Sequence, residues 1–298
     1  MQKSIIEIKN LHKKVDNIQI LNSVNLSVKE GDIFGLLGKN GAGKSTIMKI
    51  ILGLTSFDNG LVKLFNKYDI RESNKYLSYV GSLIEEPAFY PNLTAFENLK
   101  VIQMLANLRE ENIFLVLKMV GLDNQKAKLV KNYSLGMKQR LGIAMAMIKF
   151  PKLLILDEPT NGLDPQGVSE IRKIIKELPQ KYGTTVLISS HILTEIEKTA
   201  NKVAILDQGR IRYKNEISAI KSNKLIIKAD NFFMAKKLLN NYDIQVRGNE
   251  IIVNDINREE AIIVNKMLTK HNADVFDLHF KEENLEDIFL SMTVHKND

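Results

Sequence analysis

The residues most able to do chemistry form a glycine-rich loop between positions 38 and 46. The loop reads Gly-Lys-Asn-Gly-Ala-Gly-Lys-Ser-Thr, a complete P-loop motif, and a predicted apolar strand over 32–37 precedes it. Its glycines allow successive backbone N–H groups to point at phosphate oxygens, and a helix predicted over 44–54 adds its positive N-terminal end. We expect the loop to bind a nucleoside triphosphate through Gly38, Asn40, Gly41, Gly43, Lys44, Ser45 and Thr46.

Three side chains at the end of this loop have separate expected roles. Lys44 would reach the β- and γ-phosphates, and the hydroxyl of Ser45 would ligate Mg²⁺. Thr46 would help to hold the α-phosphate. The loop alone therefore predicts nucleotide binding and says nothing about what the nucleotide energises.

Two acidic residues end a short apolar strand predicted over 153–156. Asp157 stands at the tip of that strand and is the expected Mg²⁺ partner, while Glu158 would face the γ-phosphate and polarise the attacking water. His191 ends the next apolar strand, so it is also expected to reach the γ-phosphate. A lone histidine is more often structural than catalytic, but the neighbouring strand favours the catalytic reading. Glu158 and His191 are therefore the predicted catalytic residues.

The elements around these motifs predict an α/β fold. Strands alternate with helices, which is typical of a largely parallel core sheet. The first strands, predicted over 5–8 and 20–28, follow one another through short turns and should pair antiparallel. The region from about 86 to 150 has helical spacing of apolar residues, clearest over 96–120 and 140–150, and should form a helical subdomain.

The character of the chain changes after position 209. From 223 onward the pattern reads strand, helix, strand, strand, helix, strand and a final helix, which suggests a small split βαβ domain. We therefore predict a nucleotide-binding domain over 1–215, with its helical subdomain at about 86–150. A small C-terminal accessory domain is predicted over 216–298.

The composition excludes several kinds of site and of membrane segment. The chain has 298 residues, and its 44% hydrophobic and 26% charged residues are ordinary for a globular protein. It contains no cysteine, which excludes disulfides and thiolate metal sites. The opening residues do not form a signal peptide, and no apolar run reaches the roughly 18 residues that span a bilayer. If the protein works in transport, the membrane channel must belong to another chain.

The charge does not assign a partner. The net charge is +7, which could attract anionic lipid or nucleic acid. The lysines are scattered and form no long basic block, which is typical of a solvated surface. No nucleic-acid partner is expected.

A second motif resembles the signature of the ABC transporter ATPases. The segment Tyr-Ser-Leu-Gly-Met over 133–137 is similar to the family's usual Leu-Ser-Gly-Gly-Gln, and the resemblance covers about 5–212. In that family the motif caps the γ-phosphate of ATP bound to the opposite subunit. Ser134 and Gly136 match, whereas Leu135 replaces a glycine and Met137 replaces the glutamine. The resemblance thus implies a homodimer that closes around ATP and Mg²⁺, with a variant signature.

Further segments extend the resemblance. Residues 161–164, Asn-Gly-Leu-Asp, resemble the D-loop, which crosses the dimer interface in the family through a position matched by Asp164. Ser190 and His191 resemble the H-switch. The implied fold is the P-loop NTPase core of the ABC ATPase type, with antiparallel β and α-helical subdomains and a small C-terminal α+β domain.

Two positions depart from the family pattern. Val15 stands where an aromatic residue usually stacks on adenine, so ATP affinity is expected to be modest. Glu85 stands at the glutamine of the Q-loop, the coupling loop that links the nucleotide site to the membrane subunit. A glutamine both donates and accepts hydrogen bonds, whereas a carboxylate only accepts. Near ATP that charge would need Mg²⁺ or the membrane partner to neutralise it, so Glu85 joins Ser45 and Asp157 as an expected metal contact.

Within the family, the chain resembles the ATPases of bacterial exporters of peptide antibiotics, of the lantibiotic-immunity and bacitracin-resistance type. Glu85, the Pro-rich stretch 87–94 and the tail 284–290 carry this resemblance. It implies an ATP-hydrolysing homodimer at the cytoplasmic face of the cell membrane, bound to separate transmembrane permease subunits that move a peptide antibiotic. The alternatives are a transporter ATPase for another substrate, such as a lipid, and a soluble ABC ATPase outside transport.

Overall fold

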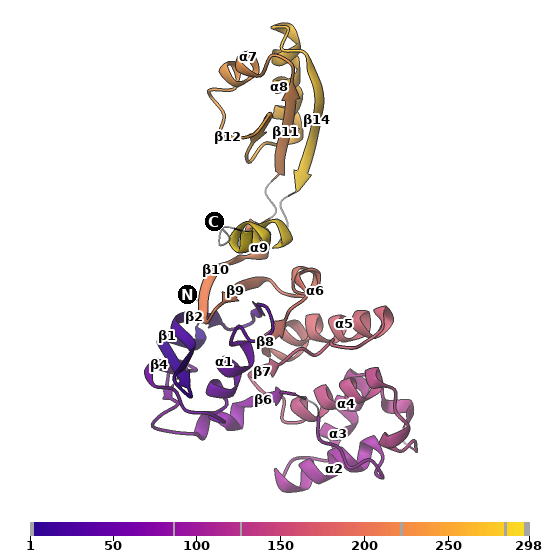
Figure 1. Ribbon diagram of the computed structural model, residues 1–298. Coiled ribbons are helices and arrows are strands. Elements are labelled where there is room, and N and C mark those ends of the chain that lie inside the picture. The colour runs from indigo at the N-terminus through magenta and orange to yellow at the C-terminus, as the bar shows by residue number, and fades with distance from the viewer. Residues whose placement is uncertain (1–2, 86, 126, 221–222, 283–284, 295–298) are drawn as a thin grey trace. The chain divides into compact units, whose positions relative to one another are not determined.

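The protein forms two compact units, residues 1–215 and 216–298, in the computed structural model (Figure 1). The structure describes residues 3–85, 87–125, 127–220, 223–282 and 285–294. The predicted start of the helical subdomain at 86 and the first residue of the tail, 284, lie outside the described residues.

The first unit is built on a six-stranded sheet with strand order β10-β9-β3-β8-β7-β6. The pairs β9–β3, β3–β8, β8–β7 and β7–β6 are all parallel, as the sequence pattern predicts. Parallel strands are covered on both faces, which explains why β3, β7 and β8 are buried along their whole length and why β3 and β7 carry no polar side chain. The strands are β3 (Ile33–Leu37), β6 (Val80–Leu83), β7 (Leu153–Leu156), β8 (Thr185–Ser190), β9 (Lys202–Asp207) and β10 (Arg210–Glu216).

A second, antiparallel sheet of the same unit confirms the prediction for the start of the chain. Its order is β2-β1-β4-β5, and β1 pairs antiparallel with both β2 and β4. The strands are longer than predicted: β1 (Ser4–Val15), β2 (Ile18–Lys29), β4 (Asn59–Leu64) and the short β5 (Tyr68–Asp69). Alternate residues of β1 and β2 are buried in the same apolar cluster as β3 and helix α1 (Lys44–Ile51). This shared core fixes the P-loop between the two sheets.

Three helices form the predicted helical region of the first unit: α2 (Ala95–Leu105), α3 (Glu111–Met119) and α4 (Leu135–Met147) (Figure 1). The helical pattern over 96–120 is divided into α2 and α3, with Asn107 in the left-handed region at φ 50° between them. Helix α2 begins with a capping box, in which Glu97 accepts from the Thr94 backbone N–H at 2.7 Å. That hydrogen bond is the main cause of the lowered pKa of Glu97.

Helix α4 begins five residues earlier than the apolar spacing predicted. Ser134 is its N-cap, and the Ser134 hydroxyl accepts from the Met137 backbone N–H at 3.3 Å. Two helices follow β7 and β8: α5 (Pro165–Tyr182), capped by Asp164, and α6 (Leu193–Thr199). The N-caps of α4 and α5 are thus residues of the two segments that resemble the signature and the D-loop.

The second unit has the predicted order of strands and helices. Its antiparallel sheet runs β12-β13-β11-β14, and helices α7 and α8 supply apolar residues to its core. This order is that of a split βαβ fold. The elements are β11 (Asn223–Ala229), α7 (Phe232–Leu238), β12 (Ile244–Arg247), β13 (Glu250–Val253), α8 (Arg258–Lys270), β14 (Val275–Glu282) and α9 (Leu285–Val294).

None of the helices in the described part of the chain is both long and apolar enough to cross a bilayer.

Candidate functional site

The P-loop joins the end of β3 to the start of α1 and is shaped for an anion. Gly41 and Gly43 have φ of 80° and 108°, which side-chain-bearing residues rarely adopt. Added methyl groups would also clash elsewhere in the loop, since a Cβ on Gly38 would lie 2.5 Å from the Leu206 carbonyl oxygen. No side chain caps α1, so its first backbone N–H groups face the loop without a side-chain partner. This arrangement fits a phosphate group.

Lys44 is directed into this loop by its surroundings. Its side chain is only 5% exposed, and Nζ donates to the carbonyl oxygen of Gly38 at 2.7 Å and lies 3.4 Å from that of Lys39. These bonds hold the ammonium group within the loop, although Lys44 begins a helix whose other inward residues are apolar. A buried cation placed at a helix N-terminus attracts a polyanion strongly.

Glu158 connects the P-loop to His191. One carboxylate oxygen of Glu158 lies 3.2 Å from Nζ of Lys44, and the other lies 2.6 Å from Nδ1 of His191. Glu158 has φ 50°, so its backbone is in the left-handed region immediately after strand β7. The three residues named from the sequence as phosphate, water and γ-phosphate contacts thus form one connected cluster.

Asp157 is fixed by the neighbouring strand. It is 8% exposed, and the Ser189 hydroxyl donates to its Oδ1 at 2.5 Å. The same Ser189 oxygen accepts from the Glu158 backbone N–H at 2.9 Å. Because β7 and β8 are adjacent and parallel, their carboxyl ends meet at this edge, and Ser189 joins them.

The residues present fit a Mg²⁺ ion that is shared with phosphate oxygens. Mg²⁺ is commonly held by one or two carboxylates together with substrate phosphates and water. Asp157 supplies a fixed, nearly buried carboxylate, and Ser45 lies at the start of α1. Within the described ranges, no three His, Cys, Asp or Glu side chains gather to form a metal site by themselves.

Glu85 forms an ion pair with Lys49, in the last turn of α1. The Lys49 Nζ lies 2.6 Å from Oε1 of Glu85, and both side chains are accessible to solvent. Hydrogen bonding and attraction to Lys49 lower the pKa of Glu85, and the same pair raises the pKa of Lys49, to which Asp157 adds. The contribution of the pair to stability is present above the ordinary Glu pKa of 4.5 and is lost as pH falls through the lowered value. An exposed ion pair of this kind contributes little to the stability of the fold. Its main effect is to fix the Glu85 carboxylate beside α1.

The signature segment faces the carboxylates across a cavity of about 780 Å³. Leu135, which replaces a family glycine, is 53% exposed at its rim, and Gly162 approaches it closely. Residues from three predicted groups line this cavity: Glu85 of the coupling loop, Leu135 of the signature, and the Asp157–Glu158 pair. Among the described residues, the Ser134 hydroxyl bonds to the Met137 backbone N–H of its own helix and to no residue of the P-loop.

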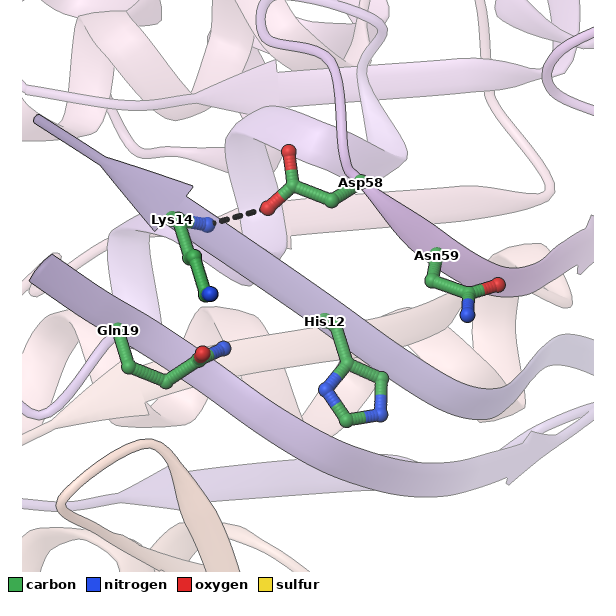
Figure 2. A pocket seen from close by; sticks show the side chains of 5 residues that line it. All are labelled: His12, Lys14, Gln19, Asp58 and Asn59. Carbon is green, nitrogen blue, oxygen red and sulfur yellow. Dashed lines mark hydrogen bonds between the residues drawn. The ribbon is translucent and has the colours of Figure 1, made fainter. Parts of the chain in front are cut away.

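The remaining predicted residues lie outside the Glu158 cluster. Val15 ends β1 and is 47% exposed, and Asp164 caps α5 by accepting from the Gly167 backbone N–H at 2.9 Å. Figure 2 shows a separate pocket on the antiparallel sheet, next to Val15 in sequence, where Asp58 accepts from the Lys14 backbone N–H. Its volume is about 410 Å³. It is lined by His12, Lys14, Gln19, Asp58 and Asn59, none of which belongs to the P-loop or to the carboxylate pair.

Sequence reasoning did not identify three residues of this region: Lys49, Ser189 and Glu195. Ser189 could have been found from its place one strand end away from Asp157. Lys49 and Glu195 carry no sequence signal, because the Lys49–Glu85 and Thr160–Glu195 contacts join segments 36 and 35 residues apart.

Comparisons with known proteins identify the family to which the chain is similar. The ABC transporter family profile matches residues 21–161. The chain is 40% identical to the bacitracin transport ATP-binding protein BcrA of Enterococcus faecalis, across 96% of this chain and 95% of that protein. It is 46% identical to the lantibiotic transport ATP-binding protein SrtF of Streptococcus pyogenes, across 71% of this chain and 91% of that protein. Among solved structures, a dimeric bacterial ABC transporter cassette, MJ0796, superimposes with a TM-score of 0.64 at 25% identity, covering 72% of this chain and 99% of that one.

Proposed function

This chain belongs to the ABC transporter family as an ATP-binding subunit and ATPase, and from that premise we propose that it energises an exporter that removes a peptide antibiotic. Relatives that it matches over most of their length include proteins named for bacitracin and lantibiotic transport. The similarity to the bacitracin relatives extends through the C-terminal unit, beyond the cassette that all such ATPases share. The observation that carries the ATPase part is the Lys44–Glu158–His191 cluster at the P-loop.

The residues of this chain have the following proposed roles. The P-loop N–H groups and Lys44 bind the β- and γ-phosphates, and Thr46 assists at the α-phosphate. Mg²⁺, held by Ser45 and Asp157 with Glu85 nearby, would neutralise phosphate charge. Glu158 orients a water and accepts its proton, and His191 fixes the Glu158 carboxylate through the 2.6 Å contact. Val15 offers adenine only apolar contact, which predicts modest affinity.

A second copy would complete the site. Ser134, Leu135, Gly136 and Met137 lie at the start of α4 and would present the Ser134 hydroxyl and helix N–H groups to ATP on the partner. Asp164 and its loop would cross the interface between the copies. The dimer would act at the cytoplasmic face of the membrane on separate permease subunits, with Glu85 in the loop that couples the two.

Growth inhibition of a deletion strain tests the proposed substrate class. The strain is exposed to lantibiotics, bacitracin and unrelated drugs, with rescue by the wild-type gene or by a Glu158→Gln gene. We expect hypersensitivity to one peptide class, rescued by wild type alone. Unchanged sensitivity to every peptide would contradict antibiotic export and would favour a lipid or another exported molecule. Co-purification with ribosomes in place of membrane proteins would contradict a transport role.

Replacing Glu85 should reduce resistance more than ATP binding. Glu85→Ala removes the carboxylate from the coupling loop and frees Lys49, but it leaves the P-loop contacts intact. The P-loop contacts of Lys44 include neither Glu85 nor Lys49, so the Kd for ATP should stay near that of the wild type. Resistance of the complemented strain should fall toward that of the deletion strain.

The matched control is Glu177→Ala, which removes another carboxylate paired with a lysine, on α5. Its pKa is lowered by Lys181 just as that of Glu85 is lowered by Lys49. It should leave both ATP binding and resistance unchanged. Full resistance in the Glu85→Ala strain would refute a coupling role for this residue.

A further inference from the structure

Two hydroxyl groups, one from the loop after β7 and one from the last residue of β8, meet on the carboxylate of Glu195 in helix α6. The Thr160 hydroxyl donates to Oε2 of Glu195 at 2.5 Å, and the Ser190 hydroxyl lies 3.2 Å from the same oxygen. Thr160 is 8% exposed and Ser190 is 2% exposed, so neither hydroxyl has ready access to water as an alternative partner. The Ser190 oxygen also accepts from the Ile192 backbone N–H at 2.9 Å, which fixes its orientation.

The positions of these hydroxyls in the chain make the contact functionally informative. Thr160 follows Glu158 by two residues and opens the segment that ends at Asp164. Ser190 directly precedes His191, whose ring touches Glu158. Glu195 therefore links Thr160, just after Glu158, to Ser190, just before His191.

Ser189 already links the carboxyl ends of β7 and β8 through two other hydrogen bonds. Ser189 donates to Asp157 and accepts from the Glu158 backbone N–H, so it fixes the two acids where they leave β7. It does not contact the residues after Glu158. The bond from Thr160 to Glu195 holds the residues after Glu158. Ser189 therefore fixes the two acids, whereas Ser190 shares Glu195 with Thr160, which follows them in the loop.

We propose that Glu195 is a positioning residue that holds His191 and the 160–164 loop in place relative to Glu158. It touches neither the P-loop nor the phosphate-binding lysine in any recorded contact, so it would act through Thr160 and Ser190. The inference rests on the proposed roles of Glu158 and His191. Without Glu195, Glu158 would keep its chemistry but lose part of its alignment, and small misalignments of a reacting group can cost tens to a hundredfold in rate.

Steady-state ATPase kinetics and hydrogen–deuterium exchange of the purified full chain test the proposal. Glu195→Ala should lower kcat about tenfold with little change in the KM for ATP, and should speed exchange of amides in 159–164. Glu195→Gln retains an oxygen that accepts hydroxyl hydrogen bonds, so it should recover most of the turnover. Thr160→Val should lower kcat less than Glu195→Ala, and adding it to Glu195→Ala should cost little more, because both changes remove the same bond.

The control is Glu197→Ala on the same helix, which should leave turnover and exchange unchanged. Glu158→Gln is measured in parallel, since its loss of turnover tests the proposed catalytic role alone. If Glu158→Gln is inactive while Glu195→Ala has normal kcat and normal exchange over 159–164, the positioning role is wrong and the catalytic assignment stands. A Glu195→Gln variant as impaired as Glu195→Ala, with equal losses in melting temperature, would reduce Glu195 to a residue needed only for folding. If Glu158→Gln is active, the catalytic assignment fails, and the exchange data still decide whether Glu195 orders the loop.

Discussion

The Glu158→Gln variant is expected to bind ATP normally and to hydrolyse it about 10²–10³-fold more slowly than the wild type. Glutamine has nearly the same shape, so it should fit beside Lys44 and His191, but it cannot take a proton from water. The substitution also removes the negative charge that lies 3.2 Å from the Lys44 ammonium. Affinity for a triphosphate should therefore be retained or increased, and a closed dimer with ATP should accumulate.

Two measurements check this expectation: phosphate release gives the turnover, and size-exclusion chromatography with ATP gives the amount of dimer. With ATP present, the wild type should elute mainly as a monomer because it hydrolyses the ATP, while Glu158→Gln should elute as a dimer. Glu177→Gln, a change of the same chemistry on the exposed face of α5, should behave as the wild type. A Glu158→Gln variant with normal turnover would remove this residue from the mechanism.

Mixing two inactive variants should restore ATP hydrolysis. Lys44→Ala removes the buried phosphate cation, and Ser134→Arg places a bulky charge at the start of α4, so each alone should lose about 10²-fold or more in turnover. In a mixed dimer one site keeps both Lys44 and Ser134, and the other site loses both. If the subunits exchange at random, half of the dimers are mixed, and up to about a quarter of wild-type activity should return.

The result depends on the proposal that each site takes its P-loop from one copy and its signature from the other. Lys39→Ala, a change of the exposed lysine in the same loop, should bind ATP normally and serves as the control for Lys44→Ala. Mixtures that stay as inactive as their components, although mixed dimers form, would show that each chain builds its site alone. Equal restoration by mixing Lys44→Ala with Glu158→Gln would also be inconsistent, because those two residues belong to the same copy in the proposed site.

The fold was predictable where local sequence and packing agree. Uninterrupted apolar strands such as β7 and β8, and the alternation in β2, identify buried and half-buried strands directly. Helix ends were less predictable, since they depend on single capping groups. Helix α4 begins at Leu135 because Ser134 caps it, and the sequence periodicity became visible only from Arg140.

The site divides in the same way. Lys44, Asp157 and Glu158 could be predicted as site residues because each lies at a strand end or in a loop whose type is evident from the chain itself. Lys49 and Glu195 were not identified, because the Lys49–Glu85 and Thr160–Glu195 contacts depend on how distant segments pack. A polar residue on a short helix, such as Glu195, looks the same in sequence whether it faces water or a loop hydroxyl.

The position of Glu158 between Lys44 and His191 has a consequence for which nucleotide the protein retains. Before ATP arrives, the carboxylate already balances the lysine charge in the P-loop. In the proposed site, nucleotide binding would therefore exchange one anion for another, and nucleotides would compete according to the negative charge they bring to Lys44. ATP would bring a γ-phosphate to that exchange, whereas ADP ends at the β-phosphate. Loss of the γ-phosphate would let Glu158 return to Lys44, which would favour release of ADP and renewed binding of ATP.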